Sequence, residues 1–214
     1  MIKTTLFEFD EAMRLQYGDP LCGTDEAGRG PLAGPVFAAA VILPPGLEII
    51  GLNDSKKLTA ARREALFDEI VAKSLACAVA SVGEEDIDNL NILNASMAAM
   101  AMAVAELDIL PAAVLVDGNR APKLDCQTVP VVKGDGKSAC IAAASILAKV
   151  SRDRYMDELS LRYPEYGFEG HKGYPTKLHY ERILTYGISP VHRVTFLKNI
   201  EEKRREFEGK GPVR

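Results

Sequence analysis

Short apolar runs alternate along the chain with longer stretches in which apolar residues recur at helical spacing. Apolar runs closed by Gly or Pro are typical of strands, whereas an apolar stripe at helical spacing is typical of helices. Thr59 is a suitable N-cap for one such helix. We expect strands at residues 21–26, 36–43, 75–82, 113–116 and 128–132. We expect helices at residues 3–17, 60–73, 84–90, 92–107, 138–161 and 177–186, a loop at 165–176, and a last helical segment to about residue 208.

The interleaving of strands and helices predicts an α/β fold with a mixed central sheet flanked by helices. The chain has 214 residues and is 47% hydrophobic, which suits one globular domain with a real core. We place this domain at residues 1–197 and a charged, helical C-terminal extension at 198–214.

Composition excludes several classes of protein. No apolar run reaches the roughly 18 residues of a membrane-spanning helix. Residues 1–6 lack the pattern of a secretory signal, and the four cysteines form no C-x-x-C pair, so we expect a cytoplasmic chain with reduced thiols. The net charge of −4 is not the strongly basic balance of many nucleic-acid binders, although an acidic active site would itself lower the total.

Two adjacent carboxylates, Asp25 and Glu26, close the first predicted strand just before Gly28-Arg29-Gly30. Hard divalent cations prefer oxygen ligands. Glycines let the backbone approach a ligand closely, and the Arg29 fork matches phosphate. One loop is thus able to hold both a metal and a phosphodiester. A polar turn with a surface Asp–Glu pair explains the same stretch equally well, and neighbouring strand residues point to opposite faces, so both carboxylates reach one ion only if the strand end bends.

Two more acidic residues follow other predicted strands, Asp117 before a glycine and Asp135 between two glycines. Strand ends on one edge of an α/β sheet converge. Two like charges about 4 Å apart cost about 4 kcal/mol at an effective dielectric of about 20, so a carboxylate cluster requires a divalent cation. Asp117 alone also fits a strand-ending turn, and Asp135 alone fits a charge at a helix N-terminus. The coincidence with Asp25 favours a two-metal phosphodiesterase site.

Six motifs, in order from about residue 20 to residue 197, resemble bacterial ribonuclease HII. They are Asp25-Glu26-Ala27-Gly28-Arg29-Gly30, Asp54-Ser55-Lys56-Lys57-Leu58, Val116-Asp117-Gly118, Lys133-Gly134-Asp135, the stretch from Ala143 to Arg154, and Gly170-His171-Lys172-Gly173-Tyr174-Pro175-Thr176.

The resemblance implies a ribonuclease H-like fold and cleavage of the RNA strand of RNA–DNA hybrids, including single ribonucleotides embedded in duplex DNA. We expect cleavage on the 5′ side of the ribonucleotide, leaving 3′-hydroxyl and 5′-phosphate ends. The resemblance also implies an acidic tetrad that holds Mg²⁺ or Mn²⁺. The tetrad consists of Asp25, Glu26, Asp117 and Asp135.

Substrate contacts are implied in the same way. Gly28-Arg29-Gly30 would read the ribose at the RNA–DNA junction, and Tyr174 would pack on the next sugar. Discriminating RNA from DNA at one position requires detection of a 2′-hydroxyl, which glycine-exposed backbone groups contact at close range. A surface tyrosine in a Gly/Pro loop is the plain alternative for Tyr174. Further candidate phosphate contacts are Lys56, Lys133, Lys172 and Ser138.

We therefore expect a cytoplasmic, monomeric endoribonuclease whose partners are RNA–DNA hybrids and ribonucleotide-containing DNA, with no membrane partner. Contact with a replication clamp does not follow from the residues. Three alternatives stay open: a related-fold nuclease acting on all-DNA or branched substrates, a catalytically silent hybrid-binding module, and a generic phosphate-binding protein.

Overall fold

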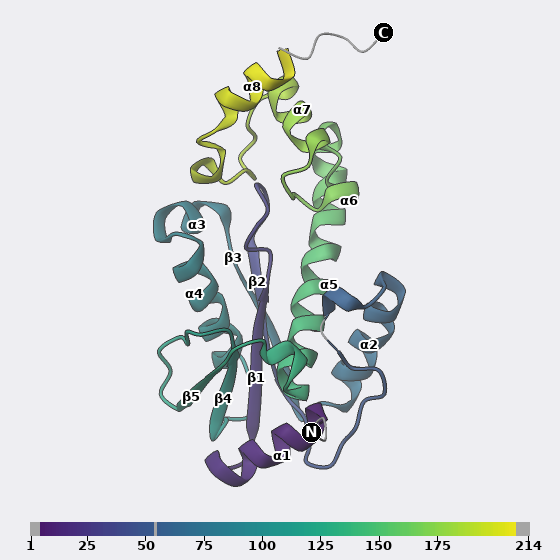
Figure 1. The fold of residues 1–214 in the computed structure, drawn as a ribbon, viewed down its shortest axis with the longest axis vertical. Helices are drawn as coiled ribbons and strands as arrows, with labels where there is room; N and C mark the ends of the chain where they lie inside the picture. Colours follow the sequence, from purple (N-terminus) through teal and green to yellow (C-terminus); the bar gives the residue numbers. More distant parts are fainter. Residues whose placement is uncertain (1–4, 54, 209–214) are drawn as a thin grey trace.

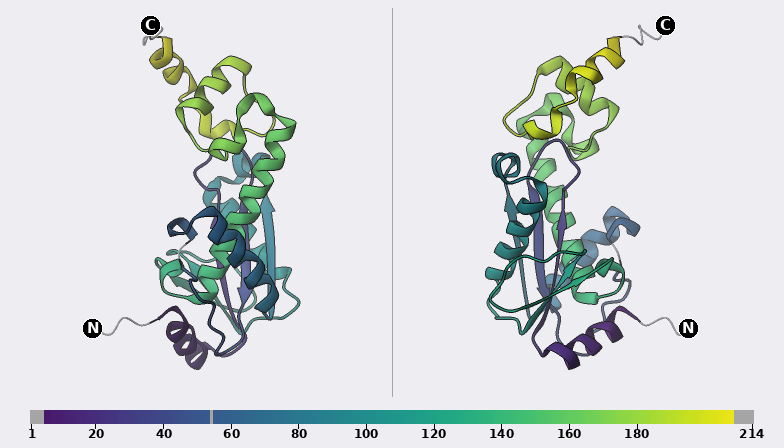
Figure 2. Two further views of the ribbon diagram at one scale, coloured as in Figure 1. Left: turned by 90° about the vertical axis from the view of Figure 1, so that its right-hand side faces the viewer. Right: turned by 60° about the vertical axis from the view of Figure 1, so that its left-hand side comes forward.

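The structure, a computed structural model, describes residues 5–53 and 55–208. A sheet with its covering helices forms the lower part of the molecule, and a small group of helices lies above it (Figure 1). The long helix α5 (Ala139–Arg162) runs through both parts, as the two further views also show (Figure 2). Residues 3 and 4 of the first predicted helix, Asp54, and residues 209–214 of the predicted tail lie outside the described residues.

Five strands form one mixed sheet in the order β3-β2-β1-β4-β5. The strands are β1 (Leu21–Ala27), β2 (Val36–Ile42), β3 (Ala76–Val82), β4 (Ala113–Asp117) and β5 (Gln127–Val131). β1 runs antiparallel to β2 and parallel to β4, and β5 runs parallel to β4. The predicted mixed sheet is therefore confirmed, and β1 and β4 present their carboxyl ends on the same edge.

Helices cover both faces of the sheet. The other helices are α1 (Leu6–Tyr17), α2 (Ala60–Lys73), α3 (Glu84–Leu90), α4 (Ile92–Ala105), α6 (Phe168–His171), α7 (Lys177–Tyr186) and α8 (Ile200–Glu208). Short 3₁₀ turns lie at η1 (Ser55–Lys57), η2 (Gly134–Gly136), η3 (Pro164–Tyr166) and η4 (Val194–Leu197). In the described part of the chain, no helix is long and apolar enough to cross a membrane.

The segment 165–176, expected to be a loop, instead contains part of η3 and all of α6. Pro164 starts η3, and Gly167 separates the two turns with a φ of +71°. The aromatic side chains that this segment carries are its core: Tyr166 and Phe168 are buried and stack at 5.4 Å between ring centroids. Burial of these rings gives the segment the short helical turns that its glycine content does not predict.

Helix α5 lies unusually close to β1. Its first ten residues, Ala139 to Ala148, are buried and rich in alanine, so little side-chain volume separates the helix from the sheet. At Gly23 a Cβ atom would stand 2.3 Å from the backbone of Cys140 and Ile141. Only a residue without a side chain fits there.

We expect Gly23→Ala to lower the free energy of unfolding by about 3 kcal/mol, because the methyl group meets rigid helix backbone rather than a mobile side chain. Chemical denaturation followed by circular dichroism measures this. Gly170→Ala is the matched control, since a Cβ there meets nothing within 4 Å and alanine favours the α6 helix. Equal stability of the Gly23 and Gly170 variants would contradict the close packing.

Candidate active site

Three of the predicted carboxylates lie at the adjacent carboxyl ends of β1 and β4. Thr24 of β1 pairs with Val116 of β4, which places Asp25 next to Asp117 on neighbouring strands. Side chains alternate between the two faces of a strand, so Asp25 starts on the same face as Leu21, and Asp117 on the same face as Leu115. Leu21 and Leu115 pack with Ile141 of α5, so this is the face that α5 covers. Glu26 follows directly in β1 and so starts on the opposite face.

The fourth predicted carboxylate, Asp135, lies in η2 just after β5. The Oδ1 atom of Asp117 accepts hydrogen bonds from the backbone amides of Gly134 at 2.6 Å and Asp135 at 3.4 Å. A Cβ atom at Gly134 would stand 2.5 Å from the Cδ1 atom of Ile141 and 3.2 Å from the same Asp117 oxygen, so a residue without a side chain fits best there. The η2 turn is thus fixed against the end of β4, and all four predicted acidic residues belong to one region.

Burial and mutual repulsion act on these carboxylates. Asp25 is 4% exposed, and its burial raises its pKa well above the ordinary value, with Glu26 and Asp117 adding repulsion. Burial also raises the pKa of Glu26, while the positive charge of Arg29 opposes the shift. The guanidinium of Arg29 lies 3.2 Å from the Glu26 carboxylate.

The chemistry of this group fits a hard divalent cation, because it offers carboxylate oxygens whose burial and repulsion a cation would offset. The side chains point at protein donors in this structure: Asp25 accepts from the Glu26 amide at 2.7 Å, and Asp117 and Glu26 have the partners given above. Within residues 5–53 and 55–208, no three His, Cys, Asp or Glu side chains form a ready-made ion cage. Asp25, Glu26, Asp117 and Asp135 are therefore candidate ligands by donor chemistry and position.

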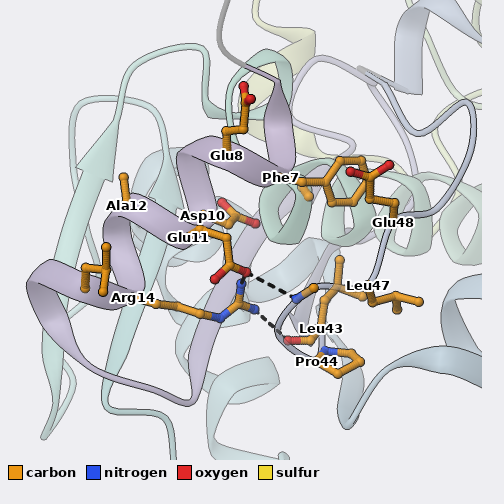
Figure 3. A pocket seen from close by; sticks show the side chains of 13 residues that line it. Phe7, Glu8, Asp10, Glu11, Ala12, Arg14, Leu43, Pro44, Leu47 and Glu48 are labelled. Carbon is orange, nitrogen blue, oxygen red and sulfur yellow. Dashed lines mark hydrogen bonds and ion pairs between the residues drawn. The ribbon is translucent and has the colours of Figure 1, made fainter.

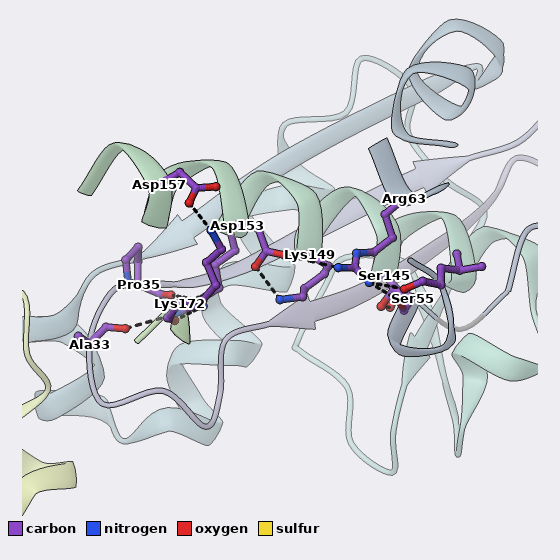
Figure 4. A network of polar contacts seen from close by, with 11 residues as sticks. Ala33, Pro35, Ser55, Arg63, Ser145, Lys149, Asp153, Asp157 and Lys172 are labelled. Atoms are coloured by element: carbon purple, nitrogen blue, oxygen red, sulfur yellow. Dashed lines mark hydrogen bonds and ion pairs between the residues drawn. The ribbon is translucent and has the colours of Figure 1, made fainter. Parts of the chain in front are cut away.

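Two serines that sequence reasoning missed connect Asp25 to η1. The hydroxyl of Ser145, on α5, hydrogen-bonds to Asp25 and lies 2.8 Å from the hydroxyl of Ser55 (Figure 4). Arg63 donates to the carbonyl of Ser55 at 3.1 Å and holds the turn in place. Lys56, the next residue, is exposed beside this link. The signal in the sequence was Ser145, a lone hydroxyl in an otherwise apolar stretch of the helix.

Two buried arginines, also missed from the sequence, shape the loop after β1. Arg193 is fully buried and donates to the carbonyl oxygens of Gly28 at 2.7 Å, Pro31 at 2.9 Å and Gly34 at 2.6 Å. Gly28 and Gly34 both adopt positive φ, +99° and +82°, which turns their carbonyls inward. The loop that carries Gly28-Arg29-Gly30 is therefore wrapped around one guanidinium.

Arg152, on α5, fixes the same loop from the other side. It is 1% exposed and donates to the carbonyls of Ala33 at 3.0 Å, Pro35 at 3.1 Å and Lys172 at 3.0 Å. Figure 4 shows how these acceptors gather at one end of the α5 network. Arg152 thereby joins the loop after β1 to the segment that precedes Tyr174.

The structure brings Tyr174 and the glycine-rich loop together. A Cβ at Gly30 would lie 3.6 Å from the Tyr174 ring, and the amide of Leu32 donates to the Gly173 carbonyl at 2.8 Å. Tyr174 is 41% exposed, so part of the residue is accessible to a ligand. Two motifs far apart in sequence therefore form one surface next to Glu26 and Arg29.

The remaining predicted contacts are placed differently from one another. Lys133 is exposed at the start of η2 with a φ of +56°, beside Asp135. Lys172 has a φ of +50° and its ammonium forms an ion pair with Asp157. Ser138, expected at a phosphate, is instead fully buried: its hydroxyl caps α5 by accepting from the Ile141 amide at 3.2 Å. A buried capping hydroxyl has no access to substrate, so Ser138 is not part of the candidate site.

A cavity of about 380 Å³ lies elsewhere, between α1 and the segment after β2 (Figure 3). Its walls include Phe7, Arg14, Leu43 and Leu47. Among the described residues, none of the predicted catalytic or substrate-binding positions lines it. The candidate site lies at the strand ends, away from this cavity.

Comparison with known proteins decides the family. A sequence model described as Ribonuclease HII matches residues 22–199. The chain belongs to the ribonuclease HII family. A Ribonuclease HII from Marinomonas sp. (strain MWYL1) is 61% identical over 184 residues, which cover 86% of this chain and 92% of the relative. Family membership confirms the resemblance seen in the six motifs and makes this chain an endoribonuclease of the H class.

Solved structures of the family agree with the fold. The ribonuclease H2 from Pyrococcus horikoshii OT3 is 30% identical with a TM-score of 0.71, and the match covers 87% of this chain and 99% of that chain. The ribonuclease HII in the PCNA:RNase HII complex from Archaeoglobus fulgidus is 27% identical with a TM-score of 0.68, covering 84% and 96%. The ribonuclease H-like fold expected from the resemblance is confirmed.

We expect Arg193→Lys to lower the free energy of unfolding by about 3 kcal/mol, because an ammonium does not replace the planar fork and leaves buried carbonyls without donors. Urea denaturation measures the loss. Arg204→Lys, at an exposed position of α8, is the control and should be neutral within about 0.5 kcal/mol. A loss below about 1 kcal/mol at Arg193 would show that the loop does not depend on this guanidinium.

Proposed function

We propose that this ribonuclease HII family member cleaves the RNA strand of RNA–DNA hybrids, including single ribonucleotides embedded in duplex DNA. Cleavage falls on the 5′ side of the ribonucleotide and leaves 3′-hydroxyl and 5′-phosphate ends. The observation that carries the proposal is that two features lie side by side: carboxylates at the ends of β1 and β4, of which Asp25 is buried, and a glycine-rich loop in contact with Tyr174.

The proposed metal ligands are Asp25, Glu26, Asp117 and Asp135, and the proposed cofactor is Mg²⁺ or Mn²⁺. When bound, two such ions supply an activated water and stabilise the leaving oxygen of the phosphodiester. The other residues of the protein hold these carboxylates in position. Ser145 orients Asp25, the amides of η2 orient Asp117, and Arg29 holds Glu26. Each carboxylate is thereby kept at the strand ends despite its neighbours' negative charge.

Recognition of the sugar is assigned to the surface between Gly28-Arg29-Gly30 and Tyr174. Backbone groups of the glycines are able to contact the 2′-hydroxyl at close range, since this group is both a donor and an acceptor. The Tyr174 ring would pack on a following deoxyribose and clash with a 2′-hydroxyl there. Arg29, Lys56, Lys133 and Lys172 are the proposed phosphate contacts.

Other expectations about the chain stay predictions. These are the cytoplasmic location, the monomeric state and the separation of a domain at residues 1–197 from a tail. Clamp contact is proposed by likeness alone: the ribonuclease HII from Archaeoglobus fulgidus forms a complex with PCNA.

The competing proposal is a nuclease of related fold that acts on all-DNA or branched substrates. Four labelled substrates compared on one gel separate the two: an all-DNA duplex, a branched DNA duplex, DNA with one ribonucleotide, and a continuous hybrid, each with Mg²⁺ and with EDTA. Cleavage of the all-DNA or a branched duplex at the rate of the ribonucleotide duplex would support the rival.

We expect Asp117→Asn to reduce cleavage by about a thousandfold and to leave hybrid binding intact, because the change removes a charge of the metal site. The asparagine oxygen still accepts from the Gly134 amide, so the fold is kept. Single-turnover cleavage and fluorescence anisotropy measure the two effects. Asp125→Asn, at an exposed position before β5, is the matched control and should cleave like the parent protein. Full activity of Asp117→Asn would remove Asp117 from the metal site.

A further inference from the structure

Three buried histidines gather in the upper helical part of the molecule, and the proposed chemistry uses none of them. His171 ends α6, His179 lies in α7, and His192 precedes η4. The rings of His171 and His179 stack at 4.3 Å between centroids, and those of His179 and His192 lie 5.3 Å apart. This cluster contacts the backbone of Tyr174 through His179.

The contacts of His192 determine where its proton is. Its Nδ1 atom accepts from the backbone amide of Ser189 at 3.1 Å, and the Ser189 hydroxyl also lies 2.7 Å away. An amide nitrogen is only a donor, so Nδ1 carries no hydrogen and the neutral ring holds its proton on Nε2.

The proton position of His192 then determines that of His179. The two Nε2 atoms are 3.1 Å apart, so His192 donates and His179 accepts. His179 therefore holds its own proton on Nδ1, which lies 3.0 Å from the carbonyl oxygen of Tyr174 and donates to it. The result is a one-way chain of hydrogen bonds from Ser189 through His192 and His179 to Tyr174.

Burial keeps the two histidines of this hydrogen-bonded chain in their neutral form. Burial is the main cause that lowers the pKa of His179 to about 3 and that of His192 to about 4, and the His171 ring contributes to both shifts. Both rings are therefore neutral near neutral pH. A second proton on His179 would set a donor against a donor at the Nε2 contact, and a second proton on His192 would face the Ser189 amide at Nδ1.

The backbone around Tyr174 is fixed at each end. The Tyr174 amide donates to the His171 carbonyl at 2.8 Å, and the Thr176 amide donates to the Tyr174 carbonyl at 2.8 Å. The amide of Gly173 donates to Nδ1 of His171 at 3.2 Å. Gly173 has a φ of +80°, and a side chain there would meet the Ala33 carbonyl at 2.5 Å. The histidine chain thus reaches the Tyr174 carbonyl, which accepts two hydrogen bonds while the ring projects toward Gly30.

We propose that His179 and His192 are positioning residues that hold the Tyr174 ring at its distance from Gly28-Arg29-Gly30, and that they thereby set the preference for a deoxyribose after the ribonucleotide. This inference rests on the proposed function, because it assigns Tyr174 to that sugar. His179 and His192 do not touch substrate; they act through the backbone of Tyr174.

If His179 and His192 only stabilised the fold, their substitution would have a different effect on cleavage from displacement of Tyr174. Loss of folded protein lowers cleavage of every substrate by the same factor. Displacement of Tyr174 changes the ratio of kcat/KM for a duplex with one ribonucleotide to kcat/KM for a continuous RNA–DNA hybrid. Since both substrates are cleaved by the same preparation, the ratio is independent of the active fraction.

The test uses two substitutions of one residue. His179→Phe keeps the ring stack and removes both nitrogens, and we expect the ratio to fall about tenfold, the scale of one lost buried hydrogen bond. His179→Asn keeps a donor near the Nδ1 position, and its ratio should stay within about threefold of the parent protein. His192→Asn keeps the acceptor for Ser189 but loses the donor to His179, so its ratio should fall less than that of His179→Phe.

Two controls complete the experiment. Ile183→Ala removes a buried side chain of α7 that is not in the chain of hydrogen bonds, and it should lower stability without changing the ratio. Tyr174→Ala should lower the ratio by itself, and adding His179→Phe to it should change the ratio no further. This lack of additivity shows that His179 acts through Tyr174.

Failure of the positioning role and failure of the proposed function give different results. If Tyr174→Ala lowers the ratio and His179→Phe leaves it unchanged, or if the two effects add fully, the positioning role is wrong and the proposed function stands. If the parent protein cleaves neither substrate with Mg²⁺ or Mn²⁺, the proposed function itself is wrong.

Discussion

The close packing of α5 against β1 is the contact on which the rest of the structure depends. It requires a residue without a side chain at Gly23 and a run of alanines on the helix. With the helix this close, its polar residues reach the strand end: Ser145 hydrogen-bonds to Asp25, and Arg152 reaches the loop that follows. One helix therefore sets both the carboxylates and the surface that would read the sugar.

In the upper part of the molecule, two side chains that donate to backbone carbonyls fix the loop after β1 and the segment before Tyr174. Arg152 and Arg193 are buried without an ion-pair partner in the described part of the chain, and each binds several carbonyl oxygens instead. Burial lowers the pKa of Arg193 to about 9, so the guanidinium stays charged at neutral pH. Such multiple contacts give the loop from Gly28 to Gly34 and the Tyr174 segment a defined separation, which discrimination of a single hydroxyl requires.

Much of this organisation is predictable from local sequence pattern. Periodicity predicts the strands and most helices, and the acidic residues after three strands predict the carboxylate region. The contributions of Arg152, Arg193 and the histidines are not predictable in this way, because their partners are backbone carbonyls and amides that any residue carries. Ser138 is a residue that the sequence pattern assigns wrongly. A hydroxyl at a helix start fits a cap and a phosphate contact equally well, and only burial decides between them.

Asp25, Glu26, Asp117 and Asp135 are proposed to act together on one group of divalent cations. Anomalous scattering from crystals soaked in Mn²⁺ tests this proposal. The expected result is a manganese peak within about 2.5 Å of carboxylate oxygens from both Asp25 and Asp117. Ordered Mn²⁺ bound only elsewhere in the protein, at a concentration that supports cleavage, would contradict it.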